Sequence, residues 1–420
     1  MTKNYYNRNL NFIIFFFLYL SLLFGFFFDE NLNFGAMPDW KYTDLPVVRE
    51  LALDIKKTLL NYDNYGHRHS PVYLIFLSLL RKIGFSYEWI RFLHLNISLF
   101  LIFFFYKFFI FKFDKIEKNL LLLFSLTIFL SPTFRSLAIW PSSRVIGLII
   151  FLISVYEFLK FLKNQKKINM CKNIVFLIIS SYVSPNFSVF IIFFLYHYFR
   201  KIDYKDLIYI LLFCFVCSIP AFYYIFILDI NFLIVREPGT NLNLSNVYSF
   251  NLSDKIFIIS SILFFHLSPF LINKEFLLNL VKPSKKEILF ITQFYLINLY
   301  FFGYLIIYTG GGVFFQLSNL LFNNNYFFYL ITLISLFVLC KLSRNSIKNY
   351  LIFFLLIISN IQNIIYHKYY DPLIMILFFT LINNPLNYKF FENRYNVFIV
   401  YSFYLVFIIM RLVKNNYSLT

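Results

Sequence analysis

Asp29 and Glu30 form an acidic pair directly after the first long apolar segment of the chain, residues 10–28. A carboxylate at the end of a membrane span lies near the depth of the lipid head groups, where it can accept a proton from a hydroxyl group. The alternative is that the pair only marks the solvated end of the span. The residue types and their position therefore favour general-base chemistry at a membrane surface.

Two histidines, His67 and His69, lie further along the same polar stretch, with Asp63 nearby. Such a set can hold a divalent metal ion. However, two histidines beside a helix that starts with proline also serve as hydrogen-bonding residues of a loop. We favour the second interpretation, and predict neither a metal nor another cofactor.

The composition is that of an integral membrane protein. Of the 420 residues, 60% are hydrophobic and only 14% are charged, whereas about a quarter of the residues in soluble domains are charged. Apolar runs of about 18 residues or more, long enough to cross a bilayer, recur along the chain. The net charge of +18 comes from short Lys and Arg clusters between these runs. This pattern is typical of cytoplasmic loops and argues against nucleic-acid binding.

With the N-terminus in the cytoplasm, the apolar runs predict an all-α transmembrane bundle of about thirteen spans in a multi-pass membrane protein. The stretch 173–199 is interpreted as two short helices that turn at Pro185, because proline ends helices and the later basic clusters then stay cytoplasmic. The other predicted spans are 10–28, 89–111, 119–132, 144–162, 207–228, 255–273, 287–308, 326–340, 349–365, 370–384 and 396–413.

Two helices are predicted in the first extracytoplasmic loop, residues 29–88. The first has a face of four apolar residues at a spacing of four: Val47, Leu51, Ile55 and Leu59. Such a helix lies along the membrane interface, and packing on another part of the loop is the alternative. The second, from Pro71 to Leu80, is too short to cross, so the next true span begins near residues 88–91.

The arrangement resembles the GT-C superfamily of membrane glycosyltransferases, which includes the dolichyl-phosphate-mannose protein mannosyltransferases and the bacterial aminoarabinose transferase of lipid A. The acidic pair and the loop with two juxtamembrane helices carry the resemblance, which is best over residues 10–165. Short motifs add to it: His69-Ser70-Pro71-Val72-Tyr73, Glu88-Trp89-Ile90-Arg91, Ser131-Pro132 followed by Arg135 and Arg144, and the late element His367–Leu373. Ser70 stands where the family usually has a second proline.

The resemblance implies a glycosyltransferase that moves a sugar from a polyprenyl-phosphate-linked donor to a lipid, glycan or protein acceptor, with inversion. It implies an active site on the periplasmic face of a bacterial inner membrane. Asp29 is the implied base and Glu30 the second choice. The residues implied for substrate binding are His69, Tyr73, Arg135, Arg144, His367, Lys368 and Asp371. Anchoring to lipid head groups is the alternative for the cations, and helix capping for Asp371.

The whole chain, 1–420, is predicted to be one integral membrane domain, with a GT-C-like catalytic module at 1–165 and a variable transmembrane module at 166–420. A transporter or lipid-linked-glycan flippase is the alternative function, and a non-catalytic assembly subunit is a third. Transporters tend to place ionisable residues inside the membrane. Glu157 is nearly the only acid inside a predicted span, which favours the enzyme.

Overall fold

The computed structural model describes residues 2–33, 35–65, 70–227, 251–272, 283–304, 310–344, 346–360 and 364–417. Its helical content is 83%, and no strand occurs in the described part of the chain. The predicted all-α class is therefore confirmed. The chain divides into two compact units, Met1–Leu244 with Val406–Thr420, and Ser245–Leu405. The first unit thus continues well past residue 165, where the sequence placed the end of a catalytic module.

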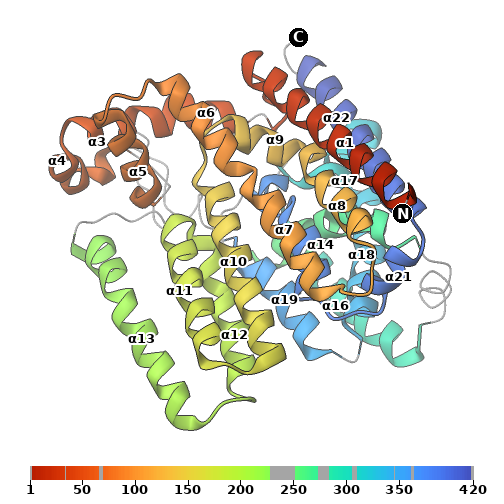
Figure 1. Ribbon diagram of the computed structural model, residues 1–420. Coiled ribbons are helices and arrows are strands. Elements are labelled where there is room, and N and C mark those ends of the chain that lie inside the picture. The colour runs from red at the N-terminus through yellow and green to blue at the C-terminus, as the bar shows by residue number, and fades with distance from the viewer. Residues whose placement is uncertain are drawn as a thin grey trace. The chain divides into compact units, whose positions relative to one another are not determined.

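Both units consist of helices joined by short connections in the described part of the chain (Figure 1). The first unit contains α1 (Thr2–Phe27), α2 (Ala36–Pro38), η1 (Asp39–Asp44), α3 (Leu45–Leu53), α4 (Ile55–Leu60), η2 (Tyr62–Tyr65), α5 (Pro71–Lys82), α6 (Tyr87–Ser98), α7 (Phe100–Lys112), α8 (Lys118–Ser125), η3 (Leu126–Leu130), α9 (Pro132–Ile139), α10 (Ser143–Asn164), α11 (Lys167–Val183), η4 (Pro185–Phe190), α12 (Ile191–Tyr198), α13 (Tyr204–Phe222) and η5 (Tyr223–Ile227). The second contains α14 (Leu252–Leu267), η7 (Ser268–Phe270), α16 (Lys285–Phe301), α17 (Gly312–Phe322), α18 (Tyr326–Ser343), α19 (Ile347–Ile358), η8 (His367–Tyr369), α20 (Leu373–Thr380) and α21 (Leu386–Glu392). The last helix, α22 (Tyr395–Tyr417), contributes to both.

Seven helices in the described ranges are long and apolar enough to cross a membrane, or eight if the pair Lys118–Leu130 and Pro132–Ile139, bent by 69°, counts as one span. The expected number of about thirteen is not confirmed. One reason is length: α19 and α20, in the predicted spans 349–365 and 370–384, contain 12 and 8 residues, too few to cross about 30 Å at about 1.5 Å per residue. The seven are Asn9–Phe27, Tyr87–Lys112, Ser143–Asn164, Tyr204–Phe222, Leu252–Phe270, Tyr326–Ser343 and Tyr395–Asn415.

The stretch 173–199 does turn back at Pro185. The Ser154 hydroxyl of α10 donates to the carbonyl of Asn173 at 2.8 Å, which pairs α10 with the beginning of α11. The Tyr198 hydroxyl, at the end of α12, donates to Asn173 Oδ1 at 2.7 Å. Because the end of α12 meets the beginning of α11, the two segments run in opposite directions. The helices α10, α11 and α12 accordingly lie side by side (Figure 1), and the predicted turn is confirmed.

Gly147 makes the close approach of α10 to the end of α11 and to η4 possible. A Cβ atom there would lie 2.6 Å from Ser184 Cβ and 3.2 Å from the Phe187 ring. We expect Gly147→Ala to lower the free energy of unfolding by about 1–3 kcal/mol, because the overpacking exceeds the gain in helix propensity. Thermal unfolding in detergent measures this. Gly303→Ala is the control, since no atom lies within 4 Å of its Cβ position; equal melting temperatures for the two variants would contradict the prediction.

The helices of the outer loop pack on each other. Val47 and Leu51 are buried, and α3 packs against α5, which is the alternative that the sequence left open. The predicted continuous helix breaks at Asp54, whose backbone is extended and whose carboxylate accepts from the Lys57 N–H at 3.0 Å. The break separates α3 from α4. In Figure 1, α3, α4 and α5 form one small group, and α5 begins at Pro71 as predicted.

Candidate functional site

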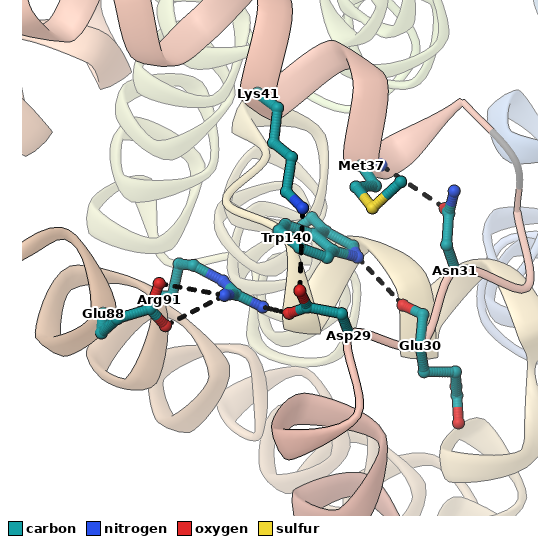
Figure 2. A network of polar contacts seen from close by, with 8 residues as sticks. All are labelled: Asp29, Glu30, Asn31, Met37, Lys41, Glu88, Arg91 and Trp140. Atoms are coloured by element: carbon teal, nitrogen blue, oxygen red, sulfur yellow. Dashed lines mark hydrogen bonds and ion pairs between the residues drawn. The ribbon is translucent and has the colours of Figure 1, made fainter.

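The end of α1 sets the directions of both acidic side chains. Asp29 has a left-handed backbone with φ 52°. Its N–H donates to the Phe26 carbonyl at 3.4 Å, and the Glu30 N–H donates to the Gly25 carbonyl at 2.7 Å. These two bonds form a Schellman cap, in which a left-handed residue closes the helix. The cap turns the chain between Asp29 and Glu30, so the two side chains point in different directions (Figure 2).

Glu30 is paired with a buried arginine. Arg135 Nε and Nη2 donate to its two carboxylate oxygens at 2.7 and 2.6 Å, and Arg135 also donates to the hydroxyl and the carbonyl of Ser21. A Cβ atom at Gly25 would lie 2.8 Å from Glu30 Oε2, so glycine leaves room for the carboxylate. Arg135 lies in α9 and its side chain is 5% exposed, whereas the predicted spans 119–132 and 144–162 leave it in the connection between them. The pair joins α1 to α9.

Asp29 faces two other cations. Arg91 Nη2 lies 2.8 Å from Asp29 Oδ1, and Lys41 Nζ lies 3.6 Å from Oδ2. The Asp29 side chain is 48% exposed, whereas that of Arg91 is 6% exposed. Glu88, one helical turn earlier, accepts from Arg91 Nη1 at 2.9 and 3.2 Å. The arrangement is an accessible carboxylate held between a buried guanidinium and a more exposed ammonium group.

Trp140 forms the floor of this cluster. The Arg91 guanidinium lies 3.9 Å and the Lys41 ammonium 5.0 Å from the ring centroid, distances at which the ring attracts cations. The indole Nε1 donates to the Glu30 carbonyl at 2.9 Å. Figure 2 shows Asp29, Lys41 and Arg91 converging beside the ring. We call Asp29, Lys41, Arg91 and Trp140 the outer cluster.

The segment that carries Lys41 is tied to its neighbours by hydrogen bonds between backbone and side-chain groups. The Met37 N–H donates to Asn31 Oδ1 at 3.4 Å, the Asn33 N–H donates to the Ser136 hydroxyl of α9 at 2.8 Å, and Asn415 Nδ2 donates to the Asn31 carbonyl at 2.9 Å. These bonds fix the chain between α1 and η1. The helix η1 is therefore held where the side chain of Lys41 reaches Asp29.

Tyr73 locks the outer loop to α6. Its hydroxyl is bonded to His94 Nδ1, and His94 Nε2 lies 2.8 Å from the Leu137 carbonyl. The Ser142 N–H also points at Nε2, but at 3.4 Å. The shorter contact to Leu137, whose carbonyl only accepts, places the imidazole proton on Nε2, so that Nδ1 accepts from the tyrosine. Burial, and secondly the charge of Asp44, raises the pKa of Tyr73 well above its ordinary value, so the phenol stays protonated. Tyr73 is 4% exposed and lies within this packing contact.

The other residues suggested by the sequence lie elsewhere. Arg144 is half-buried in the first turn of α10, and His69 lies outside the described residues. His367, Lys368 and Asp371 belong to the second unit, where His367 and Asp371 are buried and Lys368 is half-buried. Of the expected set, the structure describes Asp29, Glu30, Tyr73, Arg135 and Arg144 within the first unit. The role of each in binding a substrate stays a prediction.

His367 and Asp371 take part in a buried polar cluster of the second unit. His367 Nδ1 lies 3.0 Å from His266 Nε2, and the Val313 N–H donates to His367 Nε2 at 2.9 Å. Nε2 of His367 is thus an acceptor, so its Nδ1–H donates to His266. The Tyr404 hydroxyl donates to Asp371 Oδ1 at 3.4 Å. These bonds hold the late motif in place within the second unit.

Sequence reasoning assigned no role to three members of the outer cluster: Lys41, Arg91 and Trp140. Arg91 was part of a motif, and its spacing of three from Glu88 was the available signal, since such pairs meet on a helix. Lys41 and Trp140 gave no local signal, because their partners are distant in sequence.

Within the described ranges, no group of three or more His, Cys, Asp or Glu side chains is arranged to hold a metal ion. Comparisons with protein-family models, with curated proteins and with solved structures found no significant match. The case for a function therefore depends on the geometry and chemistry of the chain itself.

Proposed function

We propose that this chain is a membrane glycosyltransferase that transfers a sugar from a polyprenyl-phosphate-linked donor to a hydroxyl-bearing acceptor at the periplasmic face of the membrane. One observation carries the proposal: a half-exposed carboxylate at the end of a candidate span contacts two cations. The reaction requires a base for the acceptor hydroxyl and cations that bind the leaving phosphate.

The proposed reaction is a single inverting displacement. Asp29 accepts the proton of the acceptor hydroxyl while the oxygen of that hydroxyl bonds to the anomeric carbon of the sugar. The bond from that carbon to the phosphate oxygen breaks, and the polyprenyl phosphate leaves with the electron pair. Arg91 and Lys41 stabilise the charge that develops on the leaving phosphate, because a guanidinium matches phosphate oxygens and an ammonium adds a point charge.

The two cations have different parts in this scheme. Arg91 is held by Glu88, Asp29 and the Trp140 ring, so it is a preorganised donor. Lys41 is 39% exposed and its ammonium lies 3.6 Å from Asp29, a distance at which only a weak ion pair forms. Lys41 is therefore free to move from the carboxylate to a phosphate when the donor binds, and this releases one oxygen of Asp29 to act as the base.

A transporter or lipid-linked-glycan flippase is the second candidate, and ionisable groups buried in α14 favour it. Lys255 is 4% exposed, and its ammonium donates to the Asn360 carbonyl at 2.7 Å. His266 is fully buried in the same helix, which is a candidate span. Ionisable side chains inside spans commonly mark transport pathways.

The test is to reconstitute the purified chain in liposomes with radiolabelled polyprenyl-phosphate monosaccharides and a mixture of membrane acceptors. A glycosyltransferase forms labelled product and releases polyprenyl phosphate in equal amounts. Movement of the intact donor between leaflets, without product, would overturn the proposal in favour of the second candidate.

Lys41→Gln is expected to raise the KM for the donor about 3- to 10-fold and to change kcat less, since one exposed cation contributes on the order of 1 kcal/mol. Lys56→Gln, which removes an exposed lysine of α4, is the matched control and should leave KM unchanged. Initial rates at varied donor concentration measure both. An unchanged KM for Lys41→Gln would remove this lysine from the donor site.

A further inference from the structure

A second group of cations lies at the other ends of the spans, where α7 and α10 stop. These two helices pack against each other (Figure 1), and their last turns carry Lys107, Phe111, Tyr156 and Lys163. Phe111 and Tyr156 make an edge-to-face ring contact between the helices, with centroids 5.4 Å apart. We call these four residues the inner cluster.

Each lysine of the inner cluster reaches an aromatic ring of the other helix. Lys107 of α7 lies 5.5 Å from the ring centroid of Tyr156 in α10, and Lys163 of α10 lies 5.1 Å from that of Phe111 in α7. Each ammonium is thus held by an aromatic ring of the opposite helix. A third ammonium, that of Lys160 in α10, lies 4.4 Å from the Tyr156 centroid, and its charge is offset by Glu157 at 2.7 Å. The reciprocal contacts of Lys107 and Lys163 hold two further positive charges on the same ring pair, whereas lysines in a loop are free to disperse.

The two ammonium groups are accessible. Lys107 and Lys163 are exposed, and a cation above a ring keeps N–H donors for an anion. The only acid in the last two turns of α10 is Glu157, which is paired with Lys160 at 2.7 Å. Residues 107–118 and 156–167 together contain eight lysines and only three acidic residues. The region therefore carries a strong positive charge next to apolar helices.

We propose that the inner cluster binds the phosphate of an anionic phospholipid, with the acyl chains lying along α7 and α10. Both helices end two candidate spans here, so the ammonium groups lie at the boundary where lipid phosphates are concentrated. Basic sites between membrane helices select anionic head groups by charge. This inference uses neither Asp29 nor the proposed transfer reaction.

The test compares two double variants with the same change of net charge. Lys107→Gln/Lys163→Gln removes the cluster cations, and Lys166→Gln/Lys172→Gln removes two exposed lysines nearby. Native mass spectrometry then counts phosphatidylglycerol or phosphatidylcholine bound to the detergent-solubilised full chain. We expect the cluster variant to lose phosphatidylglycerol affinity by about 10- to 30-fold and the control variant by less than about 3-fold.

A third variant, Tyr156→Leu, keeps every charge and removes the ring that contacts Lys107 and Lys160. It is expected to weaken phosphatidylglycerol binding by about 2- to 5-fold, because the ammonium is no longer fixed. Equal losses in the two double variants would show only diffuse attraction and would overturn the proposal. Equal binding of phosphatidylcholine, or displacement of the lipid by millimolar inorganic phosphate, would also overturn it.

Discussion

Replacement of Asp29 by asparagine is expected to lower the rate of sugar transfer by about 10²- to 10⁴-fold, the usual contribution of a positioned general base. Asparagine keeps the shape of the side chain and an oxygen that accepts from Arg91, but it cannot take up the acceptor proton. The left-handed backbone at this position, φ 52°, also suits asparagine, which adopts that region more readily than most residues. The loss is therefore expected in kcat while the fold stays intact.

The measurement is product formation from a saturating polyprenyl-phosphate donor, together with a melting temperature for each variant. Glu50→Gln is the matched control, because Glu50 is an exposed carboxylate of α3 outside the outer cluster. It should retain the full rate. Full activity of Asp29→Asn would remove this carboxylate as the base, and a large fall in its melting temperature would indicate a structural role instead.

Arg135→Gln is expected to lower the free energy of unfolding by about 3 kcal/mol, the low end of the range for breaking a buried ion pair by removing one partner. The low end applies because the Glu30 side chain is 20% exposed, so water stabilises part of the stranded carboxylate. The variant also loses the bonds to Ser21 that tie α9 to α1. Thermal or denaturant unfolding in detergent measures the change.

A double-mutant cycle separates the ion pair from the other contacts of Arg135. Glu30→Gln/Arg135→Gln is expected to be more stable than the sum of the two single changes predicts, by about 1–3 kcal/mol, because the two residues interact directly. Strictly additive effects would show that the pair contributes nothing of its own. If Arg135→Gln instead kept its stability and lost donor binding, Arg135 would belong with the phosphate-binding cations, as the sequence first suggested.

Local features of the fold were predicted well where local rules govern them. The turn at Pro185 follows from the proline and from basic residues at both ends of the stretch, and α5 follows from Pro71 and its short apolar run. The break at Asp54 was not predicted, because the apolar repeat continues through it. Here the Asp54 carboxylate accepts from the Lys57 N–H and caps α4, and such capping competes with helix continuation.

The candidate site was predicted only in part. The position of Asp29 follows from the end of the first apolar run, but its partners do not. These partners come from three separate elements: η1 carries Lys41, α6 carries Arg91, and Trp140 follows α9. They lie near Asp29 only in the folded chain, so the spacing of residues does not reveal them. Similarly, the bond between Glu30 and Arg135 spans 105 positions of the chain, so no local pattern distinguishes that arginine from a free one.

The position of Trp140 gives the outer cluster an optical property. Indole emission depends on the electric field across the ring, and two cations lie against this ring. The chain has three tryptophans; Trp40 is buried and Trp89 is 61% exposed, so Trp89 is distinguishable by its solvent quenching. Any ligand that draws Lys41 away therefore changes the colour or intensity of the light that Trp140 emits, and the molecule carries an intrinsic fluorescent reporter of its own occupancy.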